Sequence, residues 1–123
     1  MLRDKAILIV DDNVYLALDL SHAVEASNGR VVGPVGTVAE TLALLERETI
    51  AAAVIGSHLV DGELSTVLMA LTAKDVPYVI QTDAGAPSEV ARSHPNVPIL
   101  VQPLRADEVV RSLVAEITRS RKA

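Results

Sequence analysis

The chain contains no cysteine, no phenylalanine and no tryptophan. Without cysteine it has no disulfide framework, no thiol nucleophile and no cysteine-based zinc or iron–sulfur site. Tyr15 and Tyr78 are its only residues of the Phe, Tyr and Trp class. Half of the residues are nonetheless hydrophobic, so the core has to be built from Val, Leu, Ile and Ala, a composition that suits parallel strands buried on both faces.

Positive charge is also scarce. Eleven Lys and Arg residues stand against sixteen Asp and Glu residues, which gives a net charge of −5. This balance argues against a nucleic-acid partner, because affinity for the phosphate backbone rests on clustered Lys and Arg. The one basic cluster, residues 119–122, fits a solvated helix end. No signal peptide or membrane span is visible, so we expect no membrane association and a cytoplasmic location.

The length of 123 residues indicates one domain, which we expect to span residues 1–123. Apolar runs alternate with helical patterns, which is typical of βαβ units and a parallel sheet. We therefore predict an α/β fold with a doubly wound sheet of five parallel strands. The expected strands are residues 6–10, 30–35, 51–55, 78–81 and 97–101, and the expected helices are residues 14–26, 37–48, 61–73, 88–93 and 106–119.

Two local signals refine this prediction. Gly33 and Pro34 interrupt the second strand, as is typical of a strand at the edge of a sheet. Thr37 and Glu40 have the spacing of a capping box, in which the hydroxyl accepts from the Glu40 amide while the Glu40 side chain reaches back. The second helix is therefore expected to begin at this point.

Polar or small residues stand at the ends of the predicted strands: Asp11, Asp12, Gly56, Thr82 and Gln102. In an open parallel sheet, ligands bind outside the carboxyl ends of the strands, where the strand order reverses. Two adjacent carboxylates repel each other, and burying both requires a cation or hydrogen-bond donors. Magnesium suits such a pair because it needs few carboxylates and keeps its own waters. Simple capping of the first helix by the two aspartates is the alternative.

The order of these residues resembles the receiver domain of bacterial two-component response regulators. The likeness runs along nearly the whole chain and is carried by residues 9–13, residues 32–40, Thr82 and Pro103. It implies a flavodoxin-like (βα)5 fold and a signalling module rather than an enzyme. It also implies that Thr82 matches the hydroxyl residue whose side chain, in the family, moves with the phosphoryl oxygen during switching.

The resemblance implies a magnesium site as well. In the family, carboxylates matching Asp11 and Asp12 hold the ion together with an acceptor aspartate at the end of the third strand. A backbone carbonyl two residues later, here that of His58, completes the protein ligands. Gly56 stands at the acceptor position. Glycine can neither attack a phosphodonor nor supply a third carboxylate, so we expect magnesium to bind weakly at most and no cofactor to be required.

A second departure follows the fifth strand. The conserved lysine of the family precedes a proline and contacts the phosphoryl group, whereas this chain has Gln102 before Pro103. An uncharged amide is the natural partner once the anion at position 56 has gone, so the two departures are consistent. We therefore predict a stand-alone, phosphorylation-independent pseudo-receiver that acts through protein contacts.

The resemblance also suggests partners. A histidine kinase, another regulator or a second copy of the chain is expected to bind the surface from Gln102 to Ile117 together with the fourth helix. One alternative is a degenerate receiver that still binds magnesium and is phosphorylated at Asp61 or Ser57. A second is a small phosphohydrolase on the same fold, although such enzymes need a second aspartate two residues after the nucleophile.

Overall fold

The computed structural model describes residues 2–56, 59, 64–82, 97–101 and 104–122. Strands and helices alternate along the chain, as the spacing of the apolar runs predicts. The elements are β1 (Ala6–Val10), α1 (Val14–Ala26), β2 (Arg30–Val35), α2 (Val38–Arg47), β3 (Ala52–Gly56), α3 (Leu64–Ala73), β4 (Tyr78–Thr82), β5 (Ile99–Val101) and α5 (Ala106–Lys122).

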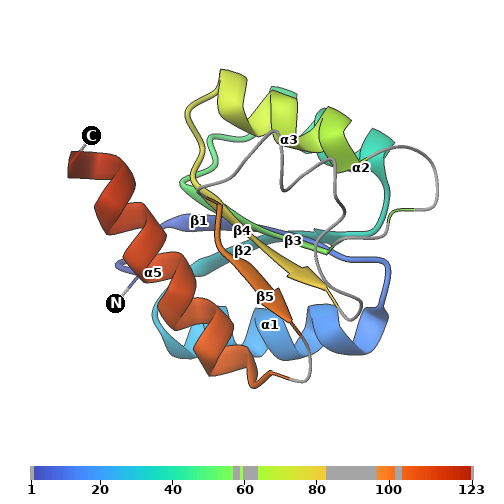
Figure 1. Ribbon diagram of the computed structural model, residues 1–123. Coiled ribbons are helices and arrows are strands. Elements are labelled where there is room, and N and C mark those ends of the chain that lie inside the picture. Colours follow the sequence, from blue (N-terminus) through green and yellow to red (C-terminus); the bar gives the residue numbers. More distant parts are fainter. Residues whose placement is uncertain (1, 57–58, 60–63, 83–96, 102–103, 123) are drawn as a thin grey trace.

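The five strands form one parallel sheet in the order β2-β1-β3-β4-β5 (Figure 1). This arrangement confirms the predicted flavodoxin-like α/β fold. The chain runs from β1 to β2 on one side and then to β3 on the other, so the strand order reverses between β1 and β3. The carboxyl ends of these two strands are where ligands bind in sheets of this kind.

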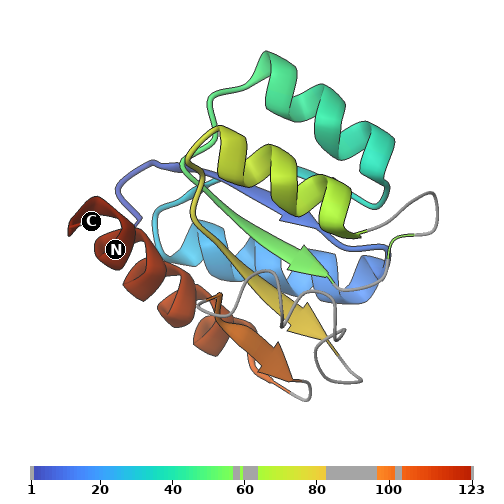
Figure 2. The same ribbon diagram turned by 45° about the horizontal axis from the view of Figure 1, so that its top comes forward.

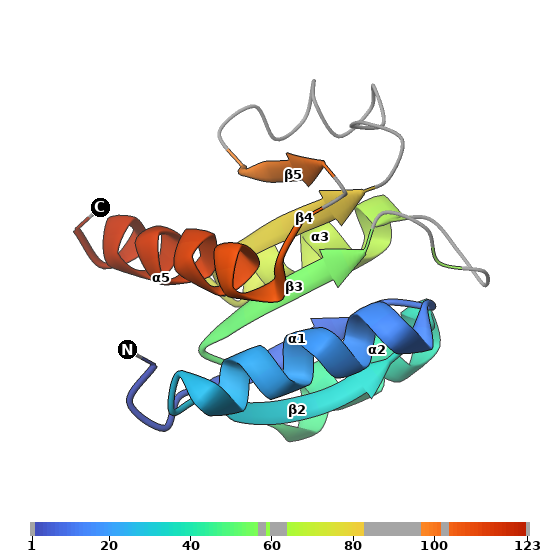
Figure 3. The same cartoon turned by 90° about the horizontal axis from the view of Figure 1, so that it is seen from below.

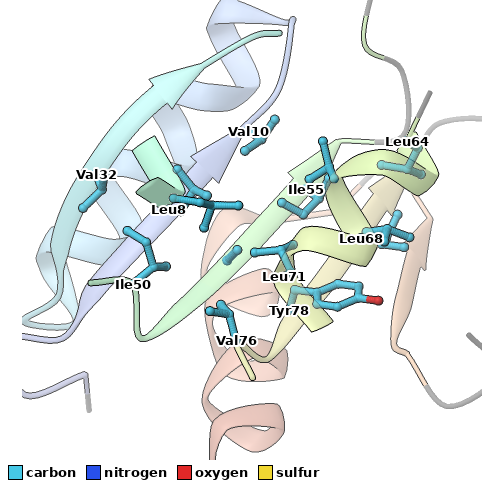
Figure 4. Packing of buried hydrophobic residues seen from close by; sticks show 14 of the residues in the cluster. Leu8, Val10, Val32, Ile50, Ile55, Leu64, Leu68, Leu71, Val76 and Tyr78 are labelled. Atoms are coloured by element: carbon cyan, nitrogen blue, oxygen red, sulfur yellow. The ribbon is translucent and has the colours of Figure 1, made fainter. Parts of the chain in front are cut away.

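Helices cover both faces of the sheet. Figures 1 and 2 show α2 and α3 on one face and α1 and α5 on the other, and Figure 3 looks onto the α1–α5 side. Successive strand residues alternate between the two layers. On the α2–α3 side, Leu8 and Ile55 pack with Leu68 and Leu71 of α3 (Figure 4). Each such buried side chain contributes about 1.5–3 kcal/mol to folding.

The N-terminus of α1 is capped by Asn13, so the alternative in which Asp11 or Asp12 caps this helix is wrong. The Asn13 carboxamide oxygen accepts hydrogen bonds from the backbone amides of Tyr15 at 3.0 Å and Leu16 at 3.2 Å. Asn13 lies closest to the unsatisfied amides of the first turn, and its side chain has the length to reach two of them. The two aspartates are therefore left for another role.

The predicted N-cap of α2 is Thr37, and the Glu40 side chain reaches back to the hydroxyl of this residue. Thr37 accepts from the backbone amide of Glu40 at 3.1 Å, and its hydroxyl donates to the Glu40 carboxylate at 2.9 Å. The edge position of β2 is confirmed as well. The pairing with β1 shifts between Val32 and Val35, and Gly33 at this bulge has a φ of +91°, which favours glycine.

Several predicted boundaries differ from those of the structure. β3 lies one residue later than expected, so Gly56 belongs to the strand and pairs with β4. β5 is shorter than predicted, because it pairs only with β4 and Pro98 has no amide hydrogen to donate. The predicted helix at residues 88–93 lies outside the described residues. In the described part of the chain, no helix combines the length and apolar character needed to cross a bilayer.

Candidate functional site

Three residues form a row across neighbouring strands at the carboxyl edge of the sheet. Gly56 of β3 pairs with Gln81 of β4, and Asp11 follows Val10, which pairs with the residue before Gly56. Each member lies two residues beyond a strand residue that is buried against α1 and α5. Because side chains alternate along a strand, the row faces the α1–α5 layer.

A buried hydrogen bond joins the two ends of this row. Gln81 Nε2 donates to Asp11 Oδ2 at 2.8 Å. The other carboxylate oxygen, Asp11 Oδ1, accepts from the backbone amide of Asn13 at 2.8 Å. Asp11 is 9% exposed and Gln81 is 3% exposed. Both oxygens of a nearly buried carboxyl group are therefore engaged by protein donors.

The hydrogen-bonded carboxyl group of Asp11 lies next to Gly56, and its present position leaves no room for a side chain there. A Cβ atom at position 56 would lie 2.8 Å from Asp11 Oδ2 and 2.9 Å from Asp11 Cγ. Contacts this short do not occur for real Cβ atoms, so any other residue at position 56 requires Asp11 to move. The carboxyl group of Asp11 thus fills the space into which a side chain at position 56 would extend.

The electrostatics of the row centre on Asp11. Burial raises the pKa of the Asp11 carboxyl group above its ordinary value of 3.8, because desolvation disfavours the charged form. The hydrogen bonds from the Asn13 amide and from Gln81 act in the opposite direction, and the nearby carboxylate of Asp12 raises the pKa further. Asp12 itself is exposed. The two adjacent aspartates thus have different environments, one buried and bonded, the other facing solvent.

The described residues supply only part of the expected magnesium site. The family's ligand set needs a third carboxylate at position 56, where glycine has no side chain, and Asp11 already accepts a hydrogen bond on each oxygen. In the described part of the chain, no group of three or more His, Asp or Glu residues is placed to hold a metal ion. The carbonyl of His58, the fourth expected ligand, lies outside that part.

The remaining predicted site residues do not all lie in this row. Thr82 ends β4 and is buried, and by alternation it faces the α2–α3 side. Gln102 and Pro103 lie outside the described residues, as do Ser57 and Asp61, the alternative acceptors. The structure therefore brings together Asp11, Asp12 and Gly56 from the predicted set.

Gln81 is the residue that the sequence analysis missed. An amide side chain was expected to compensate for the missing acceptor, but it was assigned to Gln102. The signal for Gln81 was its position: a polar residue ending the apolar run Tyr78–Ile80, in a strand buried on both faces. A buried amide needs a hydrogen-bond partner, and the end of β1, two strands away, offers one.

Solved structures similar to this chain are numerous, although no protein-family model and no curated protein sequence matches it. The chain is 36% identical to SdrG from Pseudomonas melonis Fr1, whose solution structure is of the BeF3-activated conformation. That match covers 95% of this chain and 99% of SdrG, with a TM-score of 0.75.

Two further structures complete the comparison. A solution structure of SdrG from Sphingomonas melonis Fr1 is 32% identical, with 96% of this chain and 99% of that chain covered and a TM-score of 0.79. The crystal structure of a response regulator receiver domain protein from Methanospirillum hungatei JF-1 is 20% identical, with coverage of 96% and 97% and a TM-score of 0.84. The likeness therefore extends over the whole domain.

Proposed function

Since the chain belongs to the receiver-domain family of two-component response regulators, we propose that it is a pseudo-receiver, which signals through protein contacts without being phosphorylated. One observation carries this proposal. The Asp11–Gln81 hydrogen bond crosses the sheet over Gly56, in the space that a side chain at position 56 would enter. The site is filled by the protein's own groups rather than kept open for a phosphoryl group.

The chemistry of the row supports this function. Phosphoryl transfer to a receiver requires a nucleophilic carboxylate that the phosphodonor can approach. Position 56 supplies none, and the neighbouring carboxylate, that of Asp11, is buried and hydrogen-bonded at both oxygens. SdrG has a BeF3-activated conformation. In this chain the corresponding response would need a carboxylate that Gly56 does not provide.

Magnesium has a minor role in this proposal. The exposed Asp12 is the one carboxylate of the pair that is free to bind a hydrated cation without losing a buried hydrogen bond. One exposed carboxylate holds Mg²⁺ weakly, because the ion keeps most of its waters. We therefore propose that the protein requires no metal ion and acts as a fixed binding module for a kinase, another regulator or a second copy of itself.

The experiment that tests this function uses a small phosphodonor. The native chain and Gly56→Asp are incubated with phosphoramidate and magnesium, and the intact mass is measured. We expect a phosphoryl adduct on Gly56→Asp and none on the native chain. Circular dichroism of the variant checks that it folds. A stable adduct on the native chain would contradict the proposal, and peptide mapping would then show whether Ser57 or Asp61 carries it.

A further inference from the structure

A cavity lies at the amino edge of the sheet, where β4 begins. Its volume is about 330 Å³, and its walls come from the end of α3, the turn into β4, Val97 and the end of α5. β5 begins only opposite Ile80, so the sheet narrows beside Tyr78. The cavity lies at this narrow corner and therefore reaches both helical layers, α3 on one face of the sheet and α5 on the other. Its volume is at the lower end of the ~300–1,000 Å³ that is typical of small-molecule sites.

The walls of this cavity carry two carboxylates and one guanidinium group, those of Asp75, Glu116 and Arg119. Glu116 is 9% exposed, and Arg119 donates hydrogen bonds to both of its carboxylate oxygens. These two charges compensate each other. Asp75 is exposed and forms no ion pair within the described residues. The cavity therefore has one uncompensated negative charge.

Two helix C-termini add to the negative potential. Thr72 lies in the last turn of α3 and Ser120 in the last turn of α5, and both residues line the cavity. Figures 1 and 3 show the C-terminal end of α5 at the end of the sheet where β4 begins. The C-terminus of a helix carries about half a negative charge, from carbonyl groups that have no partner within the helix. The cavity therefore favours a cation over an anion.

Asp75 is held in place by the motif that ends α3. The backbone amide of Asp75 donates to the carbonyl of Thr72 at 3.1 Å, and the amide of Val76 donates to the carbonyl of Leu71 at 2.9 Å. Asp75 has a φ of +56°, the left-handed conformation in which glycine or asparagine commonly ends a helix. Because this backbone is already fixed, little further ordering is needed when the carboxylate meets a ligand.

The cavity also has apolar walls and an uncharged hydroxyl group. Val76 and Val97 belong to the apolar part. Tyr78 is 6% exposed, and burial raises the pKa of its hydroxyl group above the ordinary value of 10.0. The carboxylate of Glu116 raises this pKa further, whereas the hydrogen bond with Thr72 acts in the opposite direction. The hydroxyl group therefore stays protonated at neutral pH and adds no negative charge that would compete with Asp75.

We propose that this cavity, which we call the amino-edge site (Thr72, Asp75, Val76, Tyr78, Val97 and Glu116), binds a small organic amine. The ammonium group of the ligand pairs with Asp75 beside the two helix C-termini, and its apolar body packs against Val76 and Val97. The site does not depend on the proposed function, because it lies at the opposite edge of the sheet from Gly56. A ligand there contacts both α3 and α5, so it connects the two helical layers.

The site is tested with three probes of similar size: 2-phenylethylamine, which is charged at neutral pH, its uncharged analogue 2-phenylethanol, and the anion phenylacetate. Each has about ten non-hydrogen atoms, which corresponds to dissociation constants in the millimolar range. Amide NMR spectra of the full chain are recorded while each probe is added. We expect saturable shifts at Asp75, Val76, Tyr78 and Ser120 with the amine. The alcohol should bind about fivefold more weakly, the size of one partly exposed ion pair, and phenylacetate more weakly still.

Asp75→Asn isolates the charge, because asparagine adopts the left-handed conformation as readily as aspartate. We expect this variant to bind the amine about fivefold more weakly and the alcohol as the native chain does. Asp4→Asn is the matched control. Asp4 is also an exposed aspartate in the left-handed conformation, with a φ of +65°, and it does not line the cavity. Its replacement should leave the binding of both probes unchanged.

Three results would overturn the proposal. The first is equal affinity of the native chain for the amine and the alcohol, or an affinity for the amine that Asp75→Asn does not change. The second is tighter binding of phenylacetate than of the amine, which would identify an anion site at Arg119. The third is a response to the amine that is centred on α1, or that does not saturate in the millimolar range, which would show that the cavity does not bind amines.

Discussion

The carboxyl group of Asp11 lies over the α-carbon of Gly56, so close that a Cβ atom at Gly56 would meet Asp11 Oδ2 at 2.8 Å. On the proposed assignment of Gly56 to the family's acceptor position, the difference from the family is thus more than one missing side chain. The neighbouring carboxyl group of Asp11 lies in that space and accepts a hydrogen bond from Gln81. Restoring an aspartate at position 56 requires a rearrangement of Asp11 as well as a new carboxylate.

Gly56→Ala tests this steric relationship without adding charge. The methyl group should force Asp11 away and break its hydrogen bond to Gln81. We expect the free energy of unfolding to fall by about 1 kcal/mol, since a lost bond to a charged group costs ~1.5–3 kcal/mol and removal of a glycine returns ~0.4–1 kcal/mol. Urea unfolding measures the change.

Gly36→Ala is the matched control for this variant. A Cβ atom there would lie 3.4 Å from its nearest neighbour, the α-carbon of Asp12, which is an ordinary contact. We expect this variant to be neutral or up to ~1 kcal/mol more stable than the native chain, because removal of a glycine returns ~0.4–1 kcal/mol and no neighbour has to move. Equal effects of the two substitutions would show that Gly56 has no special relationship with Asp11.

The hydrogen bond between Asp11 and Gln81 predicts energetic coupling. Gln81→Leu preserves the size of the buried side chain and removes its donor, so the carboxylate loses a partner at a cost of ~1–3 kcal/mol. A double-mutant cycle with Asp11→Ala should give an interaction energy of about 1 kcal/mol or more. If the two single effects simply add in urea unfolding, within ~0.3–0.5 kcal/mol, the bond does not contribute in solution.

The raised pKa of Asp11 predicts a specific pH dependence. Burial makes the folded state bind this proton more tightly than the unfolded state, whose carboxyl groups titrate near the ordinary value of 3.8. Stability from this group therefore increases as the pH falls through the folded pKa, and the gain is complete below 3.8. Asp11→Asn removes this contribution.

Urea unfolding of both proteins at several pH values provides the check. We expect the difference in unfolding free energy, Asp11→Asn minus native, to be larger at neutral pH than in acid. A difference that is constant with pH, or larger in acid, would show that the pKa of Asp11 is not raised. The other carboxyl groups are common to both proteins, so their contributions to the pH dependence largely cancel in this difference.

The N-cap at Thr37 predicts a local effect that is unrelated to the site. Thr37→Ala removes the acceptor for the Glu40 amide, so α2 should lose about 1 kcal/mol of stability. Thr66→Ala on the exposed side of α3 is the control, and it should be neutral or slightly stabilising because alanine favours helices. Equal losses in thermal unfolding would show that the cap does not stabilise α2.

Much of the fold could be predicted from the sequence, because hydrophobic periodicity determines which residues form strands and helices. The bounds of β1, α1 and β2 agree with the prediction residue by residue. The ends of strands were less predictable where they depend on pairing with a neighbouring strand. Gly56 joins β3 because Gln81 offers it a pairing partner, and no local pattern shows such a partner.

The site was predictable only in part. The acidic pair and the glycine stood out because they follow strands, and the structure places Asp11 and Gly56 side by side. Gln81 did not stand out, because its role depends on which residues share a row across three strands. The residues that share a row are known only once the pairing of β1 with β3 and of β3 with β4 is known.

The central claim is that the protein's own Asp11 and Gln81 close the phosphoryl site over Gly56. It is tested most directly by amide NMR of the native chain and of Gly56→Asp, with magnesium and then beryllofluoride, which mimics a phosphoryl group on an aspartate. We predict shifts at Asp12 and Thr82 in Gly56→Asp and no response of the native chain to beryllofluoride. A native chain that responds, at Ser57, Asp61 or any other residue, would contradict the account.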